Sequence, residues 1–270
     1  MKSTCIPVAD FNLEATLDSG QVFGFQKKAD RIYHGVLWKQ SIQFQQIHGL
    51  LTVKGDVRKV SAAQIRDYFD LDRDLEAVYR ILQSERCLAP AFLNYKGLRL
   101  IRQDSWEALA GFIVSSNNNV KRIQHIWRNL SKHFGGFPSP EKLARSHERI
   151  LRQLGLGYRA PFLLRTAQFL STSPDYLDWL RSLSYAEAKE RVLAFPGIGE
   201  KVADCVLLYG FQKYEAFPVD VWILRSMRKH YFRNRKVSEK KILNFGQKRW
   251  GQYAGYVQQY LFHSAKNGIL

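Results

Sequence analysis

Lys201 and Asp220 are the two residues of this chain whose types and settings best suit a reaction centre. Lys201 follows Pro196-Gly197-Ile198-Gly199 and opens an apolar, helix-prone run, while Asp220 follows Pro218 in FPVDVW. A neutral lysine amine is a nucleophile, and a nearby carboxylate stabilises developing positive charge or moves a proton. Each residue also has a simpler interpretation. The lysine suits a phosphate equally well, and an aspartate at a helix start is often only an N-cap.

Gly197 and Gly199 lie between two helix-like segments. Glycine adopts positive φ without strain and lets the backbone approach a ligand closely. The helix that follows begins with unpaired N–H groups and the positive end of its dipole. Together these features can hold a DNA phosphate without touching a base. The alternative is an ordinary turn between two helices.

The composition favours a nucleic-acid partner. Of the 270 residues, 41 are Lys or Arg and 24 are Asp or Glu, which gives a net charge of +17. Such a chain suits a polyanion, with nucleic acid first and an anionic membrane surface second. A basic protein with neither partner is the alternative. With 46% hydrophobic residues, the chain is expected to be globular rather than disordered.

The cysteines argue against several kinds of metal and redox site. Cys5, Cys87 and Cys205 are widely scattered and form no CxxC pair. Neither a disulfide framework nor a zinc or iron–sulfur site is indicated, so we expect no metal and no cofactor. No apolar run approaches transmembrane length and no secretory signal opens the chain, so we expect an intracellular protein.

The elements that must position the candidate residues begin with a sheet. Residues 21–55 alternate apolar and polar positions, which predicts short antiparallel strands with Gly35, Gly49 and Gly55 near the turns. Residues 62–83 predict a helix, because their apolar residues recur at helical spacing: Leu71, Leu75, Val78, Tyr79 and Leu82.

After about residue 99, every element is predicted to be helical. Asp104 with Glu107 resembles a capping box and predicts a helix through Ser115. Further boundaries are predicted at Gly135-Gly136, which ends a helix over 120–134, and at Ser139-Pro140, Gly155 and Gly157. The predicted fold is α+β. An N-terminal antiparallel β-sheet domain with helices covers 1–98, and an all-helical domain covers 99–270, with its helical hairpin near 185–210.

The motifs together resemble a known family. PGIGEKVADC followed by PVDV resembles the helix-hairpin-helix DNA glycosylase superfamily, in the form that uses a lysine and an aspartate. LDSGQVFGF, SSNNNVKRI, LGLGYRA and YAGYVQQYLF match the 8-oxoguanine DNA glycosylases in the same order. Singly these motifs are weak to moderate, but the ordered set spans nearly the whole chain and is highly specific. The resemblance also implies a sheet-rich domain before a helical one.

The resemblance implies a pocket for the damaged base. Lys201 and Asp220 would carry the chemistry, and the carbonyl of Gly20 would accept the hydrogen that 8-oxoguanine has on N7 and guanine lacks. Gln258 and Phe262 are four residues apart, so they share one helix face, where one can bind a base edge and the other can stack on it. By the resemblance Cys205 covers the opposite face of the base. Read alone, a cysteine or phenylalanine here is more often a core residue.

A second implied group handles the gap and the orphaned base. By the resemblance Asn117 fills the hole that the flipped base leaves, and Tyr158 wedges the stack beside it. Arg122 and Arg159 would contact the orphaned cytosine. The alternatives are a solvated turn for SSNNN and a general basic surface for the arginines.

The implied activity is base-excision repair. The enzyme would flip 8-oxoguanine that is paired with cytosine out of duplex DNA, cleave the glycosidic bond through a lysine Schiff base and nick the strand by β-elimination. We expect a DNA-associated monomer, located in the cytoplasm or nucleoid if the source is bacterial. Scattered cysteines argue against the iron–sulfur glycosylases, and Lys201 argues against the monofunctional alkylbase enzymes. The alternative from another class is a non-catalytic helix-hairpin-helix DNA-binding module.

Two features depart from the family pattern or add to it. Trp222 lies where animal members of the family carry a histidine that contacts the DNA backbone, so either the tryptophan packs there or a nearby basic residue compensates. The segment 225–249 is rich in Lys and Arg, with Glu239 as its acidic residue. It is interpreted either as a DNA-facing surface or as a solvated helix surface.

Overall fold

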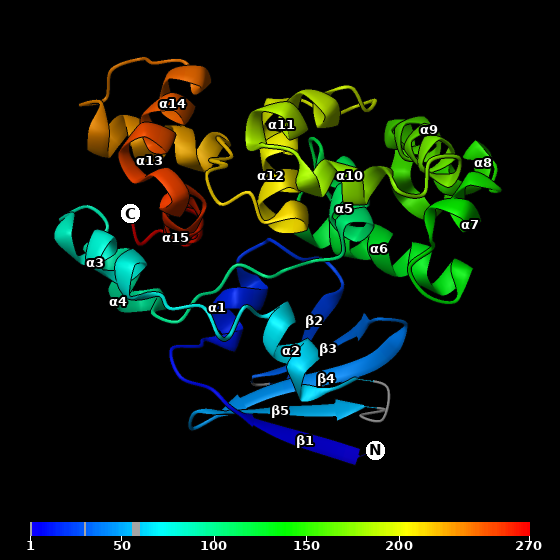
Figure 1. Cartoon of the computed structure of the whole chain (residues 1–270), viewed down its shortest axis with the longest axis horizontal. Coiled ribbons are helices and arrows are strands. Elements are labelled where there is room, and N and C mark those ends of the chain that lie inside the picture. The colour runs from blue at the N-terminus through cyan, green and yellow to red at the C-terminus, as the bar shows by residue number, and fades with distance from the viewer. Residues whose placement is uncertain (1, 30, 56–59) are drawn as a thin grey trace.

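The N-terminal part is an antiparallel sheet. The computed structural model describes residues 2–29, 31–55 and 60–270. The strands follow one another in the sheet as β1-β5-β4-β3-β2 (Figure 1). Their bounds are β1 (Lys2–Pro7), β2 (Phe25–Ala29), β3 (Ile32–Leu37), β4 (Gln40–Ile47) and β5 (Leu50–Gly55). The predicted strands within 21–55 are therefore confirmed. Strand β1 was not predicted, because it is ordered by pairing with β5 from the far end of the sheet segment.

The glycines of the sheet have different roles. Gly49 has φ +75° in the turn between β4 and β5, as predicted. The prediction that Gly35 lies near a turn was wrong. Gly35 lies inside β3 opposite Phe25 and Ile42, and a Cβ there would come 2.3 Å from Phe25 Cδ1. This glycine therefore makes room for the ring of the neighbouring strand.

The predicted helix over 62–83 is two helices. The first helices of the chain are α1 (Leu13–Asp18), α2 (Ala62–Tyr68), α3 (Glu76–Ser84) and α4 (Ala89–Tyr95). Between α2 and α3 the chain turns through Asp70, which has φ +50°. The Asp70 side chain accepts hydrogen bonds from Arg73 and Arg102, the latter at 2.6 Å. Apolar spacing did not reveal the break, because distant polar partners stabilise this turn.

The remainder of the chain is helical, as predicted. Its α-helices are α5 (Ser105–Ser115), α6 (Val120–Phe134), α7 (Pro140–Ala144), α8 (Glu148–Leu151), α9 (Ala160–Ser171), α10 (Tyr176–Ser182), α11 (Tyr185–Leu193), α12 (Glu200–Phe211), α13 (Val221–Tyr231), α14 (Glu239–Trp250) and α15 (Ala254–Lys266). Short helical turns are η1 (Arg152–Leu156), η2 (Gly157–Arg159) and η3 (Gly251–Tyr253). Gly135 ends α6 at φ +69° and Ser139 caps α7, as predicted. Asp104 caps α5 by accepting from the Glu107 N–H, which is one half of the predicted capping box.

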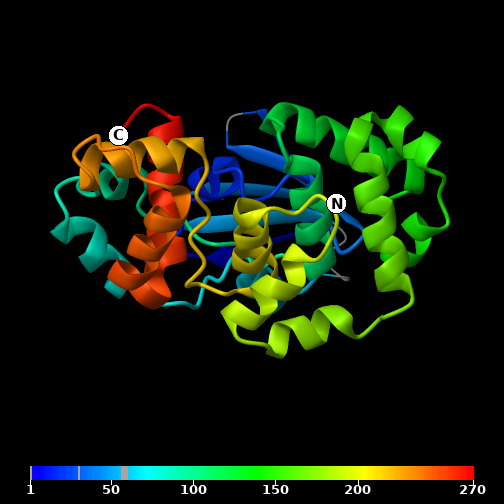
Figure 2. The same cartoon turned by 90° about the horizontal axis from the view of Figure 1, so that it is seen from above.

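Two apolar cores hold these elements. Helix α2 packs on the sheet, and the helical part of the chain, from α5 onward, lies above α2 and the sheet (Figures 1 and 2). The larger core joins the helices from α3 onward and also takes in Phe23 from the segment before β2. Helices α3 and α4 therefore pack with the helical part although they precede residue 99. None of the helices in the described ranges has the length and apolar character needed to span a membrane.

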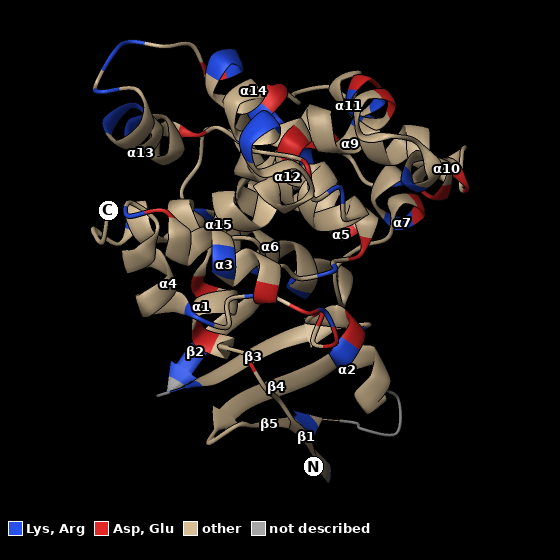
Figure 3. Cartoon of the chain, turned by 60° about the vertical axis from the view of Figure 1, so that its left-hand side comes forward, with Lys and Arg blue, Asp and Glu red and all other residues tan. Residues whose placement is uncertain are grey.

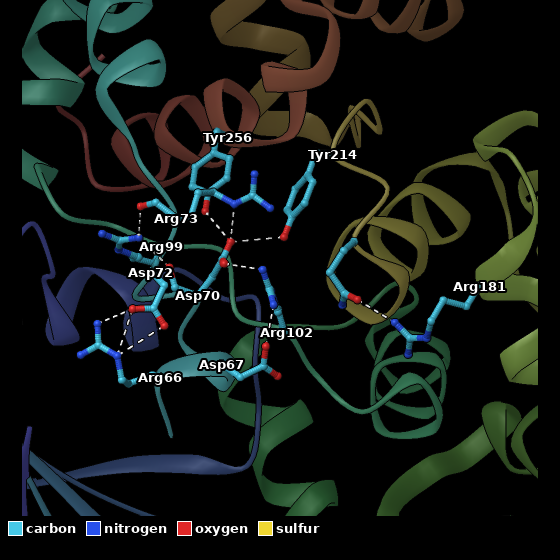
Figure 4. A network of polar contacts seen from close by, with 11 residues as sticks. Arg66, Asp67, Asp70, Asp72, Arg73, Arg99, Arg102, Arg181, Tyr214 and Tyr256 are labelled. Carbon is cyan, nitrogen blue, oxygen red and sulfur yellow. Dashed lines mark hydrogen bonds and ion pairs between the residues drawn. The ribbon is translucent and has the colours of Figure 1, made fainter. Parts of the chain in front are cut away.

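Asp70 is the centre of a polar network between the two parts (Figure 4). Besides its two arginines, its Oδ2 accepts from Tyr214 at 3.3 Å and from Tyr256 at 3.4 Å. Arg99 donates to the Asp70 carbonyl at 2.6 Å. The network thus ties the α2–α3 turn to α15 and to the segment that leads toward α13.

Candidate active site

The hairpin between α11 and α12 is built around its first glycine. Gly197 has φ +78°, and a Cβ on it would lie 2.3 Å from Phe162 Cδ2. Gly199 is the N-cap of α12 and has no side-chain cap, and a Cβ on it would meet nothing within 4 Å. The predicted turn is confirmed. Gly197 is required by conformation and packing, whereas Gly199 leaves the first N–H groups of α12 open to a ligand.

Lys201 and Asp220 line one pocket from different helices. Lys201 is in the first turn of α12, partly buried, with its Nζ 5.8 Å from the centroid of the Phe112 ring. Asp220 caps α13 by accepting from the Ile223 N–H at 2.8 Å. Burial raises the pKa of Asp220, while the Ile223 N–H and Lys201 oppose that shift. The N-cap interpretation of Asp220 is thus correct, and the same carboxylate also faces the pocket.

The pocket holds about 240 Å³ and collects all the residues predicted for chemistry and base binding. Those residues are Gly20, Lys201, Cys205, Asp220, Gln258 and Phe262. The remaining lining is mostly apolar and aromatic: Phe23, Phe112, Ser115, Asn118, Val120, Ile123, Tyr209, Pro218, Val221, Trp222 and Lys266. A planar group with a few polar edges suits such a lining.

Gln258 lines the pocket and carries a buried acceptor that has no partner. Its side chain is 3% exposed, and its Nε2 donates to the Pro218 carbonyl at 3.0 Å. Its Oε1 is buried and has no hydrogen-bond partner. A buried acceptor without a partner is costly, and a ligand N–H in the pocket would satisfy it.

Gly20 lies next to the Phe262 ring, and both residues line the pocket. Gly20 has φ +79°, and a Cβ there would lie 3.5 Å from Phe262 Cε1. The turn is held against α15 because Gln259 donates to the Ser19 carbonyl at 3.0 Å. Burial raises the pKa of the Cys205 thiol to about 11, so this side chain is a neutral wall of the pocket at pH 7.

The loop between α5 and α6 carries the residues predicted for the gap. Asn117 is exposed and has φ +48°. Arg159, 3% exposed, donates to the carbonyls of Ser116 and Asn117 at 2.7 Å each. Tyr158 is 48% exposed, and its OH donates to the Ser116 carbonyl at 3.3 Å. Arg122 is exposed in the first turn of α6.

The two arginines that were predicted to share one role therefore have different surroundings in the structure. Arg122 is free to reach a partner, whereas the Arg159 guanidinium is occupied by the backbone of the loop. Contact of Arg159 with an orphaned base stays a prediction.

Lys266 is a pocket residue that sequence analysis missed. It lies four residues after Phe262 and eight after Gln258, on the same face of α15. That spacing was the available signal. Trp222 also lines the pocket, and its ring lies 5.9 Å from Arg225 Cζ.

A larger groove of about 860 Å³ lies between the hairpin and α13–α14, and Lys201 also lines it. Within it Asp204 accepts from Tyr185 at 2.6 Å and pairs with Lys189 at 3.0 Å. Burial raises the pKa of Asp204 against the opposing effect of Lys189. Because these groups satisfy one another, the 240 Å³ pocket is the better candidate for the reaction.

Basic residues crowd α13, the loop to α14 and the first turn of α14 (Figure 3). Many of the side chains are exposed there, namely Arg225, Lys229, Arg233, Arg235, Lys236, Lys240 and Lys241. Arg249 instead pairs with Glu85 at 2.9 Å. Whether this surface faces DNA stays a prediction. Within the described ranges no group of three His, Cys, Asp or Glu side chains could hold a metal ion.

Both parts of the chain match models of known families. Residues 4–109 match the model of the 8-oxoguanine DNA glycosylase N-terminal domain, and residues 110–252 match that of the HhH-GPD superfamily of base excision DNA repair proteins. A "Probable N-glycosylase/DNA lyase" of Methanothermobacter thermautotrophicus is 33% identical, over 98% of this chain and 97% of that protein. The chain belongs to the 8-oxoguanine DNA glycosylase family. The N-glycosylase/DNA lyase of Saccharomyces cerevisiae is 32% identical over 74% of this chain and 65% of its own length.

Solved structures of the family share the whole fold. The Clostridium acetobutylicum 8-oxoguanine glycosylase/lyase, in complex with duplex DNA that has cytosine opposite 8-oxoguanine, is 30% identical. It aligns with a TM-score of 0.89 over 97% of this chain and 93% of that one. MBOgg1 in complex with a low-affinity DNA ligand is also 30% identical, with a TM-score of 0.91 over 99% of both chains. The predicted α+β fold of this family member, a sheet part followed by a helical glycosylase part, is confirmed.

Proposed function

We propose that this protein excises 8-oxoguanine from duplex DNA and then nicks the strand, as a bifunctional DNA glycosylase/AP lyase of base-excision repair. One observation carries the proposal. In a chain of this family, Lys201 and Asp220 line the same pocket as Gly20, Gln258 and Phe262. The proposed nucleophile and the proposed base-binding groups thus share a space large enough for a single base.

The pocket would receive a base that has left the stack. Flipping costs a few kcal/mol, because stacking and pairing are lost. Phe262 and Cys205 would cover the two faces of the base, and the free Oε1 of Gln258 would accept a hydrogen from its pairing edge. The Gly20 carbonyl would accept the N7 hydrogen that distinguishes 8-oxoguanine from guanine, whose N7 lone pair it would repel.

Lys201 would act as the nucleophile. Its neutral amine attacks C1′, the bond from C1′ to the base breaks, and the base leaves with the electron pair and takes up a proton. The added nitrogen gives up a proton, the C1′–O4′ bond breaks, O4′ takes up a proton and the nitrogen electron pair forms the Schiff base. Loss of a C2′ proton then expels the 3′ phosphate. Asp220 would stabilise the positive charge that develops at the sugar, held in place by its bond to the Ile223 N–H.

The remaining predicted residues would hold the DNA around the flipped nucleotide. Asn117 and Tyr158 would fill the gap and wedge the stack, and the open N–H groups near Gly197 and Gly199 would bind a phosphate. Arg122 and Arg159 would favour cytosine as the orphaned base, because guanidinium donors suit its acceptors.

We further propose a DNA-associated, intracellular monomer. Its sheet domain would comprise 1–98 and its glycosylase domain 99–270. The duplex partner is expected to carry 8-oxoguanine paired with cytosine.

An incision assay tests the activity. Duplexes with one 8-oxoguanine paired in turn with C, A, G and T are incubated with the protein, and the products are resolved with and without borohydride. We expect the fastest incision opposite cytosine and a covalent protein–DNA adduct after reduction. Base loss without an adduct would contradict the lyase step. Binding without base loss would instead support a non-catalytic DNA-binding module.

A further inference from the structure

Lys266 adds a second positive charge to the pocket. It is the last residue of α15, and its Nζ lies 5.9 Å from the centroid of the Phe262 ring. Among the lining residues, Lys201 and Lys266 carry the positive charges. Because Lys201 must be neutral to attack, Lys266 is the cation that remains in the lining while the proposed reaction proceeds.

The ammonium of Lys266 has no close anionic partner in the described part of the protein. No described carboxylate oxygen lies within 4.0 Å of its Nζ, which lies over the Phe262 ring. The two carboxylates that act on it from farther away already have donors of their own. Asp18 accepts from the Tyr33 OH at 2.7 Å, and Asp220 accepts from the Ile223 N–H.

Lys266 lies at the outer end of the pocket-facing stripe of α15. Along this stripe Gln258 is fully buried, whereas Phe262 and Lys266 are partly exposed, and Asn267 beyond them is exposed. Partial burial lowers the pKa of Lys266, with Asp18 and Asp220 opposing that shift. A charge that is partly desolvated and has no counter-ion is stabilised when an anion arrives.

We propose that Lys266 binds a backbone phosphate that flanks the flipped nucleotide, at the mouth of the pocket. The proposal rests on the proposed function, since a nucleotide that enters this pocket must bring its flanking phosphates past the outer end of α15. The position of Lys266 at that outer end, rather than beside Gln258, favours a phosphate over the base itself.

The test compares affinities in a Lys201→Gln background, in which the DNA is not cut. The dissociation constant for an 8-oxoguanine duplex is measured over a series of salt concentrations, with Lys266 intact and with Lys266→Met. We expect about tenfold weaker binding in the variant, and a slope of log affinity against log salt that is smaller by about 0.9. Lys266→Arg should retain most of the affinity. Lys54→Met is the matched control, because it removes an equal charge from an exposed position on β5.

Duplexes in which a single phosphate is replaced by a neutral linkage identify the phosphate that Lys266 contacts. Duplexes with a methylphosphonate immediately 5′ or 3′ to the lesion are bound by both proteins. One of the two neutral linkages should weaken binding about tenfold for the protein with Lys266 intact. The same linkage should not weaken binding further for the Lys266→Met variant. Additive losses at both linkages would overturn the proposal. So would an unchanged salt slope with lost discrimination between 8-oxoguanine and guanine, which would indicate a contact to the base. Failure of the proposed function would appear separately, as absent incision by the wild-type protein.

Discussion

Arg159 donates a 2.7 Å hydrogen bond to the carbonyl of Asn117, which lies 42 residues earlier in the chain. A second bond of the same length goes from Arg159 Nε to the Ser116 carbonyl. The guanidinium is buried, so it fixes the backbone of the loop that presents Asn117. A residue that shapes the loop should affect stability when it is lost, whereas a residue that contacts the orphaned base should affect the preference for cytosine. The buried Arg159 and the exposed Arg122 can therefore be distinguished by substitution.

Arg159→Ala and Arg122→Ala should therefore differ in stability. The Arg159 variant loses buried, charge-assisted hydrogen bonds, so we expect about 2 kcal/mol less unfolding free energy and a melting temperature lower by several degrees. Arg122→Ala, at an exposed position, should melt like wild type and lose preference for cytosine opposite the lesion. Melting curves and incision opposite C and A measure both effects. A double variant that keeps full preference for cytosine would contradict contact of either arginine with the orphaned base.

Lys201→Gln should bind the lesion duplex but neither excise the base nor form an adduct with borohydride. The glutamine keeps much of the side-chain volume and removes the nucleophile. Asp220→Asn should keep binding and the cap on α13 while losing most of the rate, about 100-fold or more, because the developing charge loses its carboxylate. Single-turnover kinetics and trapping check this. A Lys201→Gln protein that is trapped at the wild-type rate would show that another amine, such as Lys266 in the same pocket, is the nucleophile.

Gln258→Ala should lose discrimination between 8-oxoguanine and guanine by about 1–3 kcal/mol, because the base edge loses its hydrogen bonds. Gln259→Ala is the contrasting variant. Both ends of Gln259 are bonded within the protein, to Tyr209 and to the Ser19 carbonyl, so its loss should lower the melting temperature more. Excision rates on 8-oxoguanine and guanine duplexes and melting curves separate the two. Unaltered cutting and binding by Gln258→Ala would mean that the pocket is wrongly assigned.

Asp70→Asn should destabilise the junction between the two parts of the protein. The asparagine tolerates the positive φ, but it leaves Arg73 without its charge partner and leaves Arg102 paired with Asp67 alone. Both arginines are about one-third exposed, so we expect a loss of about 2–3 kcal/mol, less than for a fully buried pair. Asp72→Asn is the control, because its pair with Arg66 is exposed and should contribute little to stability. Equal melting temperatures for the two variants would contradict the role of the network.

His263 should make stability fall as the solution is acidified. Burial, aided by Lys266, lowers the pKa of His263 to about 4, below its usual 6.5. Between these values the unfolded chain binds a proton that the folded protein does not, so stability is present above pH 6.5 and is lost as the pH falls toward 4. The full effect is about 3 kcal/mol. His263→Phe keeps a ring beside Tyr95, 4.2 Å away between centroids in the wild type, and should remove this part of the pH dependence. Identical unfolding profiles for both proteins from pH 7 to 4 would contradict it.

Local chemistry in the sequence determined much of the helical part. The helix over 120–134, its end at Gly135 and the caps at Asp104 and Ser139 were predicted correctly, since these depend on neighbouring residues. The hairpin and the positions of Lys201 and Asp220 were likewise visible as short motifs. Gly20 and Cys205, by contrast, were identified through family resemblance, because neither residue type in its own segment indicates a base pocket.

Only the tertiary structure decided how the distant segments meet. It placed Gly20 against Phe262, left the Oε1 of Gln258 without a partner and buried Arg159 on the Asn117 loop. It also broke the predicted helix over 62–83 at Asp70. These features arise from contacts between residues far apart in the chain, whose energies leave no trace in local spacing or propensity. The sequence therefore determined which groups are available for chemistry, and packing decided which of them face one another and which are already satisfied.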